Sequence, residues 1–177
     1  NSVHGPYAQS WVDEWHRTQV SEHSYYCSNF KFKKGLVAEK ESSTYNLHVA
    51  DKMWLNKNFK NTILQKIARC DMDSKRYVYS DLGFVLLQQV VEAIVKLPMD
   101  LYLAKEFYAP MGLQRTMYLP LLRYSKQEIM PTAANDFLRR QDLCGYVHDE
   151  TAACMGGISG NAGLFSTATE VAKIYQM

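Results

Sequence analysis

One segment constrains the fold of this chain more than any other: residues 82–95, which read Leu-Gly-Phe-Val-Leu-Leu-Gln-Gln-Val-Val-Glu-Ala-Ile-Val. Its polar residues are almost confined to Gln88, Gln89 and Glu92. A helix that is apolar around most of its circumference is usually buried. The run is shorter than the roughly 18 apolar residues expected of a membrane-spanning helix. We therefore expect a core helix that other elements cover on most sides, and no membrane span.

Length and charge narrow the class of protein. The chain has 177 residues, which is enough for one domain with its own core. Its 20 Lys and Arg against 18 Asp and Glu leave a net charge of only +2. The basic residues are scattered except for Lys31, Lys33 and Lys34, so no electrostatic footprint for nucleic acid is present. We expect one folded domain over residues 1–177 that does not bind nucleic acid.

Helical spacing recurs elsewhere in the chain. Apolar residues at positions 59, 63, 64 and 67 predict a helix that begins at Phe59 and ends near Cys70. Pro98 suits the first turn of a helix that continues through Phe107. The segment Thr167-Ala168-Thr169-Glu170 matches the S/T-x-x-E capping box, which predicts the start of another helix.

The remaining segments have weaker patterns. Tyr7, Trp11 and Trp15 recur at i, i+4 and i+8, which predicts a helix with three rings on one face. Residues 21–47 show no sustained period and predict a long surface excursion with short extended pieces. Residues 114–147 are expected to be irregular, since their two prolines limit regular structure. The expected fold class is therefore mainly α with long loops.

The triplet Tyr79-Ser80-Asp81 stands immediately before the apolar helix and allows two interpretations. Ser80 or Asp81 could be an N-cap, accepting hydrogen bonds from backbone N–H groups that otherwise lack partners. Alternatively, Tyr79 could carry a proton. A phenol has a pKa of about 10, so it can do this at neutral pH only beside a cation that favours the phenolate. The second interpretation therefore requires a lysine that approaches from elsewhere.

Two further segments suggest binding sites. The glycine-rich residues 155–163 contain no G-x-x-x-x-G-K motif and follow no parallel-strand unit, so close backbone approach explains the glycines better than phosphate binding does. His148, Asp149 and Glu150 are consecutive and point in different directions, so they are not expected to form a metal site. Asp149 is expected to cap a short helix that ends at Cys154, and His148 to border a substrate cleft.

Four segments occur here in one order: Tyr79-Ser80-Asp81, then residues 110–113, 145–149 and 156–167. That order resembles the serine β-lactamase-like family, which includes penicillin-binding proteins, class C β-lactamases and related esterases. The resemblance runs from about Val49 to Met177 and leaves residues 1–48 as a variable excursion. It looks closest to modules that some bacterial proteins carry fused to a family 3 glycoside hydrolase of the β-N-acetylhexosaminidase type.

The resemblance implies roles for individual residues. In that family the nucleophile is the serine of an S-x-x-K motif, and the tyrosine of a Tyr-x-Asn motif helps to move the proton. Tyr79 matches that tyrosine, and Asp81 stands where many members have Asn. An ionised Asp only accepts hydrogen bonds, so the change leaves esterase or peptidase-like acyl transfer as open as β-lactam chemistry. The resemblance places the loop that contains Gly157 near the substrate-binding cleft, which His148 is also expected to border, and it implies no metal or organic cofactor.

Two elements of the family are missing. No Lys/His-Thr-Gly sequence is present. Ser28-Asn29-Phe30-Lys31 has the letters of S-x-x-K, but the residues that follow, 32–35, are a poor start to a buried helix, so we interpret it as a chance match. The family fold has a helical subdomain and an α/β subdomain built from both ends of the chain. We therefore expect an excerpt that contains the helical part and is inactive alone.

These observations lead to one expected function and its alternatives. The chain is expected to be part of a serine hydrolase, with a small-molecule or peptide substrate of the cell-wall type and with the remainder of the parent chain as its partner. Family habit suggests the bacterial periplasm or cell envelope. A non-catalytic carbohydrate- or peptide-binding module, or a structural module attached to a glycoside hydrolase, would also fit the missing motifs.

Overall fold

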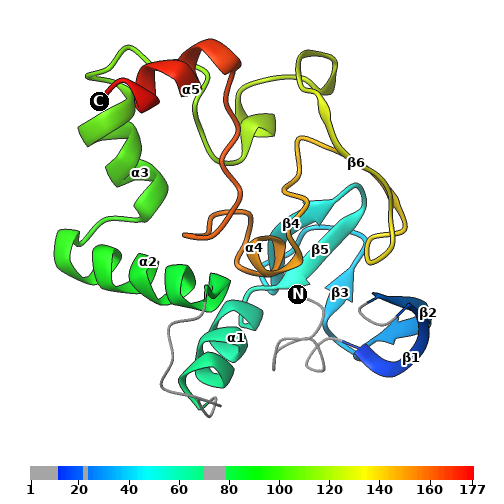
Figure 1. The fold of residues 1–177 in the computed structure, drawn as a ribbon. Coiled ribbons are helices and arrows are strands. Elements are labelled where there is room, and N and C mark those ends of the chain that lie inside the picture. Colours follow the sequence, from blue (N-terminus) through cyan, green and yellow to red (C-terminus); the bar gives the residue numbers. More distant parts are fainter. Residues whose placement is uncertain (1–11, 22–23, 70–78) are drawn as a thin grey trace.

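A computed structural model describes residues 12–21, 24–69 and 79–177 of the chain (Figure 1). The described residues form a mixed α/β fold with three small antiparallel sheets and five α-helices. The expectation of a mainly α fold was therefore wrong. The strands occupy segments that the sequence patterns assigned to a helix, to irregular structure or, over residues 21–47, to a surface excursion with short extended pieces.

The first sheet is a hairpin of β1 (Val12–Ser21) and β2 (Ser24–Phe32). The helix predicted around Trp15 is therefore wrong, while Tyr7 and Trp11 lie outside the described residues. A spacing of four residues is even, so it places residues on one face of a strand as well as on one face of a helix. For this reason the aromatic pattern could not distinguish the two structures.

The second sheet has the strand order β3-β5-β4 and is formed by β3 (Val37–Ala38), β4 (Tyr45–Ala50) and β5 (Met53–Asn56). The third is a hairpin of β6 (Pro131–Asp136) and β7 (Gln141–Cys144). Two short 3-10 helices, Pro120–Leu122 and Lys126–Glu128, precede it. The segment 114–147 is thus more regular than expected, because its prolines lie at the start of a 3-10 helix and of a strand.

Three predicted helices are confirmed in the first part of the chain. They are α1 (Phe59–Ala68), α2 (Asp81–Val95) and α3 (Met99–Leu103), and α3 continues into a π-helical turn over Ala104–Tyr108.

The two C-terminal helices begin as their caps predicted, with one difference. Asp149 caps α4 (Glu150–Cys154) by accepting from the Ala152 N–H at 2.7 Å. Thr167 caps α5 (Ala168–Tyr175) by accepting from the Glu170 N–H at 3.3 Å. The Glu170 carboxylate does not complete the capping box, because it accepts from the backbone N–H groups of residues 114 and 115 instead.

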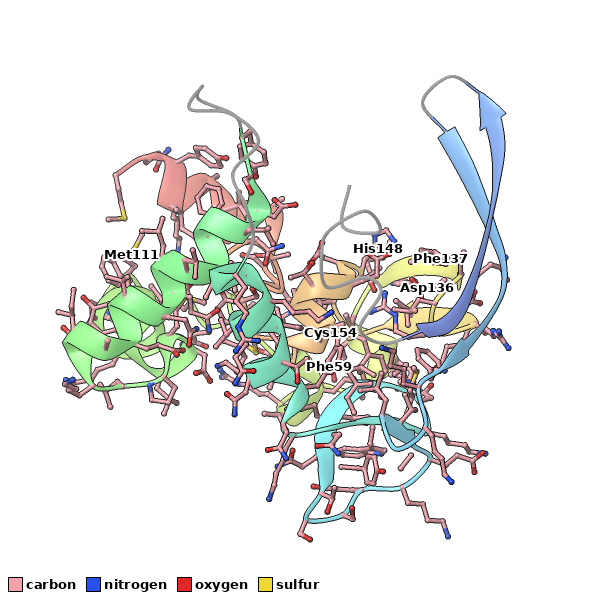
Figure 2. All side chains as sticks on the ribbon, turned by 90° about the horizontal axis from the view of Figure 1, so that it is seen from below. Phe59, Met111, Asp136, Phe137, His148 and Cys154 are labelled. Carbon is pink, nitrogen blue, oxygen red and sulfur yellow. The ribbon has the colours of Figure 1, made fainter. Side chains whose placement is uncertain are left out.

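The core lies where α1 and α4 meet the β3-β5-β4 sheet. Leu55, Ile63, Leu143 and Cys154 are almost completely buried there. Figure 2 shows Cys154 and Phe59 near the centre of this part of the molecule. Most of the buried apolar residues thus come from strands and short helices, and the long apolar helix contributes Val85.

The apolar helix α2 is not covered on most sides, contrary to expectation. Only Val85 and Gln88 are fully buried in it. Five large apolar side chains of α2 are exposed: Phe84, Leu86, Leu87, Val90 and Ile94. Figure 1 shows α2 at the periphery, where described elements pack against one of its sides. An exposed apolar face of this extent commonly marks an interaction surface.

In the described part of the chain, no single helix has the length and apolarity to cross a bilayer. The pair formed by α2 and the helical segment Met99–Tyr108 meets those two criteria jointly, with a bend of 69° between its members.

Candidate functional site

The start of α2 carries the triplet singled out from the sequence. Ser80 occupies the N-cap position with extended backbone angles, φ −146° and ψ 125°, but its side chain makes no capping hydrogen bond. The position was therefore predicted correctly and the bond was not. Asp81 lies in the first helical turn, where its negative charge interacts favourably with the positive end of the helix dipole.

Tyr79 precedes this cap and is open to solvent. Its side chain is 70% exposed, and its ring centroid lies 5.9 Å from that of Phe84. Within the described residues, no lysine forms a hydrogen bond with the Tyr79 hydroxyl. The phenol is thus accessible to a group that approaches the N-terminus of α2, and the cation that proton transfer needs would have to arrive in that way.

The glycine-rich loop is fastened to α2 by one buried amide. The Gln88 Nε2 donates to the Ile158 carbonyl at 3.3 Å, and its Oε1 accepts from the Gly160 N–H at 3.2 Å. A Cβ atom on Gly160 would lie 2.2 Å from the Phe84 carbonyl oxygen. The loop and the helix therefore meet backbone to backbone, which confirms the interpretation of this glycine. Phe84 contacts both Tyr79 and the loop, so the two motifs share one end of α2.

Gly157 lies in the packed part of the same loop. Its φ is +83°, and a Cβ atom there would lie 2.5 Å from Leu119 Cδ2. A Cβ on Gly163 would lie 2.4 Å from the Gly157 carbonyl oxygen. The space that Gly157 lines with His48 and Tyr146 is about 10 Å³, close to the volume that a single water needs. Gly157 thus shapes the loop, and the space beside it is too small for a larger ligand.

Asp149, Asn161 and Ser159 form a polar chain behind this loop. Asp149 Oδ1 accepts from Asn161 Nδ2 at 3.1 Å as well as from the Ala152 N–H of α4. The Ser159 hydroxyl donates to Asn161 Oδ1 at 2.6 Å, and Ser159 is only 1% exposed. A buried hydroxyl that donates to an amide is not available as a nucleophile, so these residues hold the loop.

His148 is exposed and lies beside the β6–β7 hairpin, where Figure 2 shows it near Asp136 and Phe137. Its carbonyl accepts from Arg139 Nη2 at 2.5 Å, and the Val147 carbonyl accepts from Arg139 Nη1 at 3.0 Å. No contact within the described residues joins His148 to Tyr79. The structure therefore brings together Tyr79, Asp81 and the Gly160 loop, and places His148 on a different element.

The pair Asp136–Arg139 that positions His148 was missed in the sequence. Two parallel bonds of 2.8 Å join the Arg139 Nε and Nη2 to the two carboxylate oxygens, and the side chains are 0% and 1% exposed. Burial raises the pKa of Asp136, but the hydrogen bonds and charge of Arg139 outweigh it, so that the pKa lies below its usual value. Opposite charges three residues apart inside a hairpin turn were the only signal.

A second network joins distant strands and was also missed. The Tyr146 hydroxyl donates to Asp51 Oδ1 at 2.9 Å and lies 3.1 Å from His48 Nε2. Lys126 forms an ion pair with the other oxygen of Asp51, and the His48 ring stacks on Trp54 at 3.9 Å. Burial and the Asp51 carboxylate raise the pKa of Tyr146. This phenol is therefore held protonated, unlike one that would carry protons at neutral pH.

Comparison with known proteins supports part of the family resemblance. Over 132 residues, 66% of this chain, the sequence is 35% identical to a "Putative D-alanyl-D-alanine carboxypeptidase" of Escherichia coli (strain K12). Proteins of the same description from Salmonella schwarzengrund (strain CVM19633) and Salmonella agona (strain SL483) are 32% and 31% identical over 147 residues, 75% of this chain. This chain is similar to bacterial proteins of that description.

The similarity covers only a part of these relatives. The chain spans 30% of the Escherichia coli protein and 34% of each Salmonella protein. No family model matches the chain. No solved structure matches it either. The relation to peptidase-type proteins is thus established at the level of sequence similarity.

Proposed function

We propose that this chain supplies part of a serine hydrolase of the D-alanyl-D-alanine peptidase type, with a peptide substrate of the bacterial cell wall and a location in the cell envelope. The observation that carries the proposal is the identity of 35% over 132 residues to a relative of that description. In this proposal residues 49–177 form the helical region of the α/β serine β-lactamase and peptidase fold, and residues 1–48 form a variable part of the same domain.

Tyr79 is the proposed proton-transfer residue. Its exposed phenol stands at the N-terminus of α2, where the helix dipole favours a negative charge. An ammonium group next to the oxygen would favour the phenolate and allow it to accept the proton of a serine nucleophile. Asp81, the first residue of α2, is the proposed acceptor that orients polar groups of the cleft. His148 and Gly157, which lie on other segments, are the proposed border of that cleft.

The other groups that acyl transfer requires would come from outside these residues. Ser28 and Lys31 lie in strand β2, so they lack the helix start on which an S-x-x-K motif places its serine and lysine. The sequence also has no Lys/His-Thr-Gly strand. The exposed apolar face of α2 is what a domain would show where neighbouring elements are missing. We therefore expect the 177 residues alone to have no acyl-transfer activity.

The test uses the complete gene product that contains these residues and a covalent fluorophosphonate probe. Replacing Tyr79 with Phe should slow acylation by about a hundredfold to ten-thousandfold, the usual contribution of a general acid or base, while circular dichroism stays unchanged. Tyr175→Phe is the matched control, since that tyrosine is also exposed but lies at the end of α5. Equal labelling of the wild type and Tyr79→Phe would remove Tyr79 from the mechanism.

The 177-residue chain provides a second arm of the test. The probe should leave it unlabelled, and stoichiometric modification of Ser28 would refute our interpretation of that motif as a chance match.

A non-catalytic module remains the competing proposal, favoured by the two motifs that this sequence lacks. Such a module, attached to a glycoside hydrolase, would bind a peptide or a carbohydrate or serve as a structural part. Nuclear magnetic resonance titration with a peptide ending in D-alanyl-D-alanine and with an N-acetylglucosamine oligomer separates these cases. Specific shifts in a complete gene product that the probe cannot label would favour the binding module.

A further inference from the structure

A cavity of about 550 Å³ lies between residues 115–132 and residues 164–168. Its lining does not include Tyr79, Asp81, His148 or Gly157. The volume falls within the range of about 300 to 1,000 Å³ that small-molecule sites usually have. The cavity is therefore large enough for a ligand, and it is separate from the residues to which the proposed function gives a role.

Two tertiary interactions hold the walls of this cavity together. Met117 and Phe165 form an antiparallel bridge in which each N–H donates to the carbonyl of the other at 2.9 Å. Next to it, the hydroxyl oxygens of Thr116 and Ser166 lie 2.7 Å apart. Because these contacts join segments about fifty residues apart, the cavity depends on the fold and not on one flexible loop.

The walls are mainly apolar and partly open to solvent. The apolar lining includes Met117, Ile129, Met130, Leu164 and Phe165. Met130 is 84% exposed and Leu164 is 44% exposed, so both side chains have apolar surface that a ligand could cover. Covering such surface is favourable by about 25 cal/mol for each Å² removed from water.

Arg115 supplies a cation at the edge of these walls. Its guanidinium lies 5.7 Å from the centre of the Tyr124 ring, which also lines the cavity. Within the described residues, the Arg115 side chain forms no ion pair. Its backbone N–H donates to both oxygens of Glu170 at 3.1 and 3.0 Å, which fixes the residue at the cavity. The guanidinium thus remains able to bind an anion.

The nearby carboxylates already have their own donors. Glu170 also accepts from the Gln114 N–H at 2.9 Å and from the Thr116 hydroxyl at 2.6 Å. Glu128 lines the cavity, and its Oε2 accepts from the backbone N–H and the hydroxyl of Ser125 at 3.0 and 2.9 Å. Neither carboxylate lies close enough to the Arg115 guanidinium for an ion pair. The hydrogen bonds from Ser125 lower the pKa of Glu128, and the more distant charge of Arg115 adds to this effect.

We propose that this cavity binds an amphipathic monocarboxylate, whose carboxylate pairs with Arg115 and whose aliphatic body covers Met117 and Leu164. A guanidinium is planar and presents parallel N–H groups that match the two oxygens of a carboxylate. The apolar walls exclude a highly charged ligand, since no second free cation lines the cavity in the described part of the chain. A single anionic group with an aliphatic tail satisfies both features.

Isothermal titration calorimetry on the full chain tests the proposal with octanoate and 1-octanol, which differ mainly in the charged end. The wild type should bind octanoate at least about tenfold more tightly than 1-octanol, because a hydrogen bond to a charged group contributes roughly 1.5 to 3 kcal/mol. Arg115→Gln should reduce the affinity for octanoate to that for 1-octanol. Lys105→Gln, which removes an exposed positive charge from another element, should leave both affinities unchanged.

Two more variants separate the anion site from the apolar walls. Leu164→Ser should weaken the binding of both ligands to a similar extent. If Arg115→Gln does not fold, as judged by circular dichroism, Arg115→Lys can replace it. This variant keeps the positive charge but lacks the parallel N–H groups of the guanidinium, so it should show an intermediate preference for octanoate. Equal affinities of the wild type for the two ligands, a preference for octanoate that survives Arg115→Gln, or a full wild-type preference in Arg115→Lys would overturn the proposal. Tyr79→Phe should not alter octanoate binding, so this test is independent of the proposed function.

Discussion

The ion pair Asp136–Arg139 should be the most sensitive point of the fold outside the apolar core. Both side chains are buried, at 0% and 1% exposure, and Arg139 also donates to the carbonyls of Val147 and His148. Replacing Arg139 with Met leaves a buried carboxylate with only the backbone N–H of residue 139 as a described donor, at 2.7 Å. Removing one partner of a buried ion pair usually costs about 3 to 5 kcal/mol.

The expected loss is large compared with the whole stability of a domain, which is typically about 5 to 15 kcal/mol. We therefore expect Arg139→Met to lower the free energy of unfolding by about 3 kcal/mol or more in urea titrations at pH 7. Lys105→Met removes one partner of the exposed pair with Glu106 and should not change the unfolding midpoint measurably.

The double replacement of Asp136 by Leu and Arg139 by Met tests the reason for the loss. Replacing both members of a buried pair by apolar residues is often neutral, so the double variant should be more stable than Arg139→Met alone. The recovery should be incomplete, because the carbonyls of Val147 and His148 still lose their donor. The reasoning is wrong if Arg139→Met costs less than about 1 kcal/mol, or if the double variant is the less stable of the two.

Three further outcomes follow from the geometry. The pKa of Asp136 is lowered in the folded state. Its contribution to stability is therefore fully present above its unfolded pKa of about 3.9 and should be lost as the pH falls through its folded pKa. Measuring the free energy of unfolding at a series of acidic pH values would detect this loss. Gly160→Ala should destabilise the fold by about 1 to 3 kcal/mol, because the new Cβ would lie 2.2 Å from a carbonyl oxygen of α2. Gly83→Ala should instead stabilise the fold by about 0.5 to 1 kcal/mol, because nothing lies within 4 Å of the new Cβ. A loss of folding free energy at Gly83 equal to the loss at Gly160 would contradict this account of the loop. Replacing Leu87 and Ile94 by Gln should reduce the fluorescence of a bound apolar dye and leave the melting temperature nearly unchanged. The reason is that these side chains are 57% and 74% exposed. Undiminished dye binding would show that the dye binds to another apolar surface.

Local signals predicted the helices well. The apolar spacing that begins at Phe59, the proline at position 98 and the side chains of Asp149 and Thr167 each act within about one helical turn. Such signals depend on neighbours in the sequence, so they can be recognised without knowledge of the fold. Gly160 in the loop also indicated a close approach of two backbone segments, but the sequence did not identify Phe84 as the residue it approaches.

The misses involve contacts between distant segments. The strand Val12–Ser21 is formed through pairing with β2, and its aromatic spacing fits a helix equally well. The Glu170 side chain does not bond within its predicted capping box and instead accepts from backbone N–H groups more than fifty residues away in the sequence. Arg139, Tyr146 and Arg115 gained their roles from segments that no local pattern connects to them.

By itself, the sequence determined where the five helices α1 to α5 begin and that Tyr79, Ser80 and Asp81 stand at the start of α2, because these depend on local periodicity, caps and residue type. Only the tertiary structure decided that α2 keeps an apolar face open, that Tyr79 is exposed while Tyr146 is buried, and that a cavity forms beside Arg115. Burial and the pairing of charges depend on which distant segments meet in space. A side chain's exposure is therefore decided by the packing around it, even where its secondary structure follows from its neighbours in the chain.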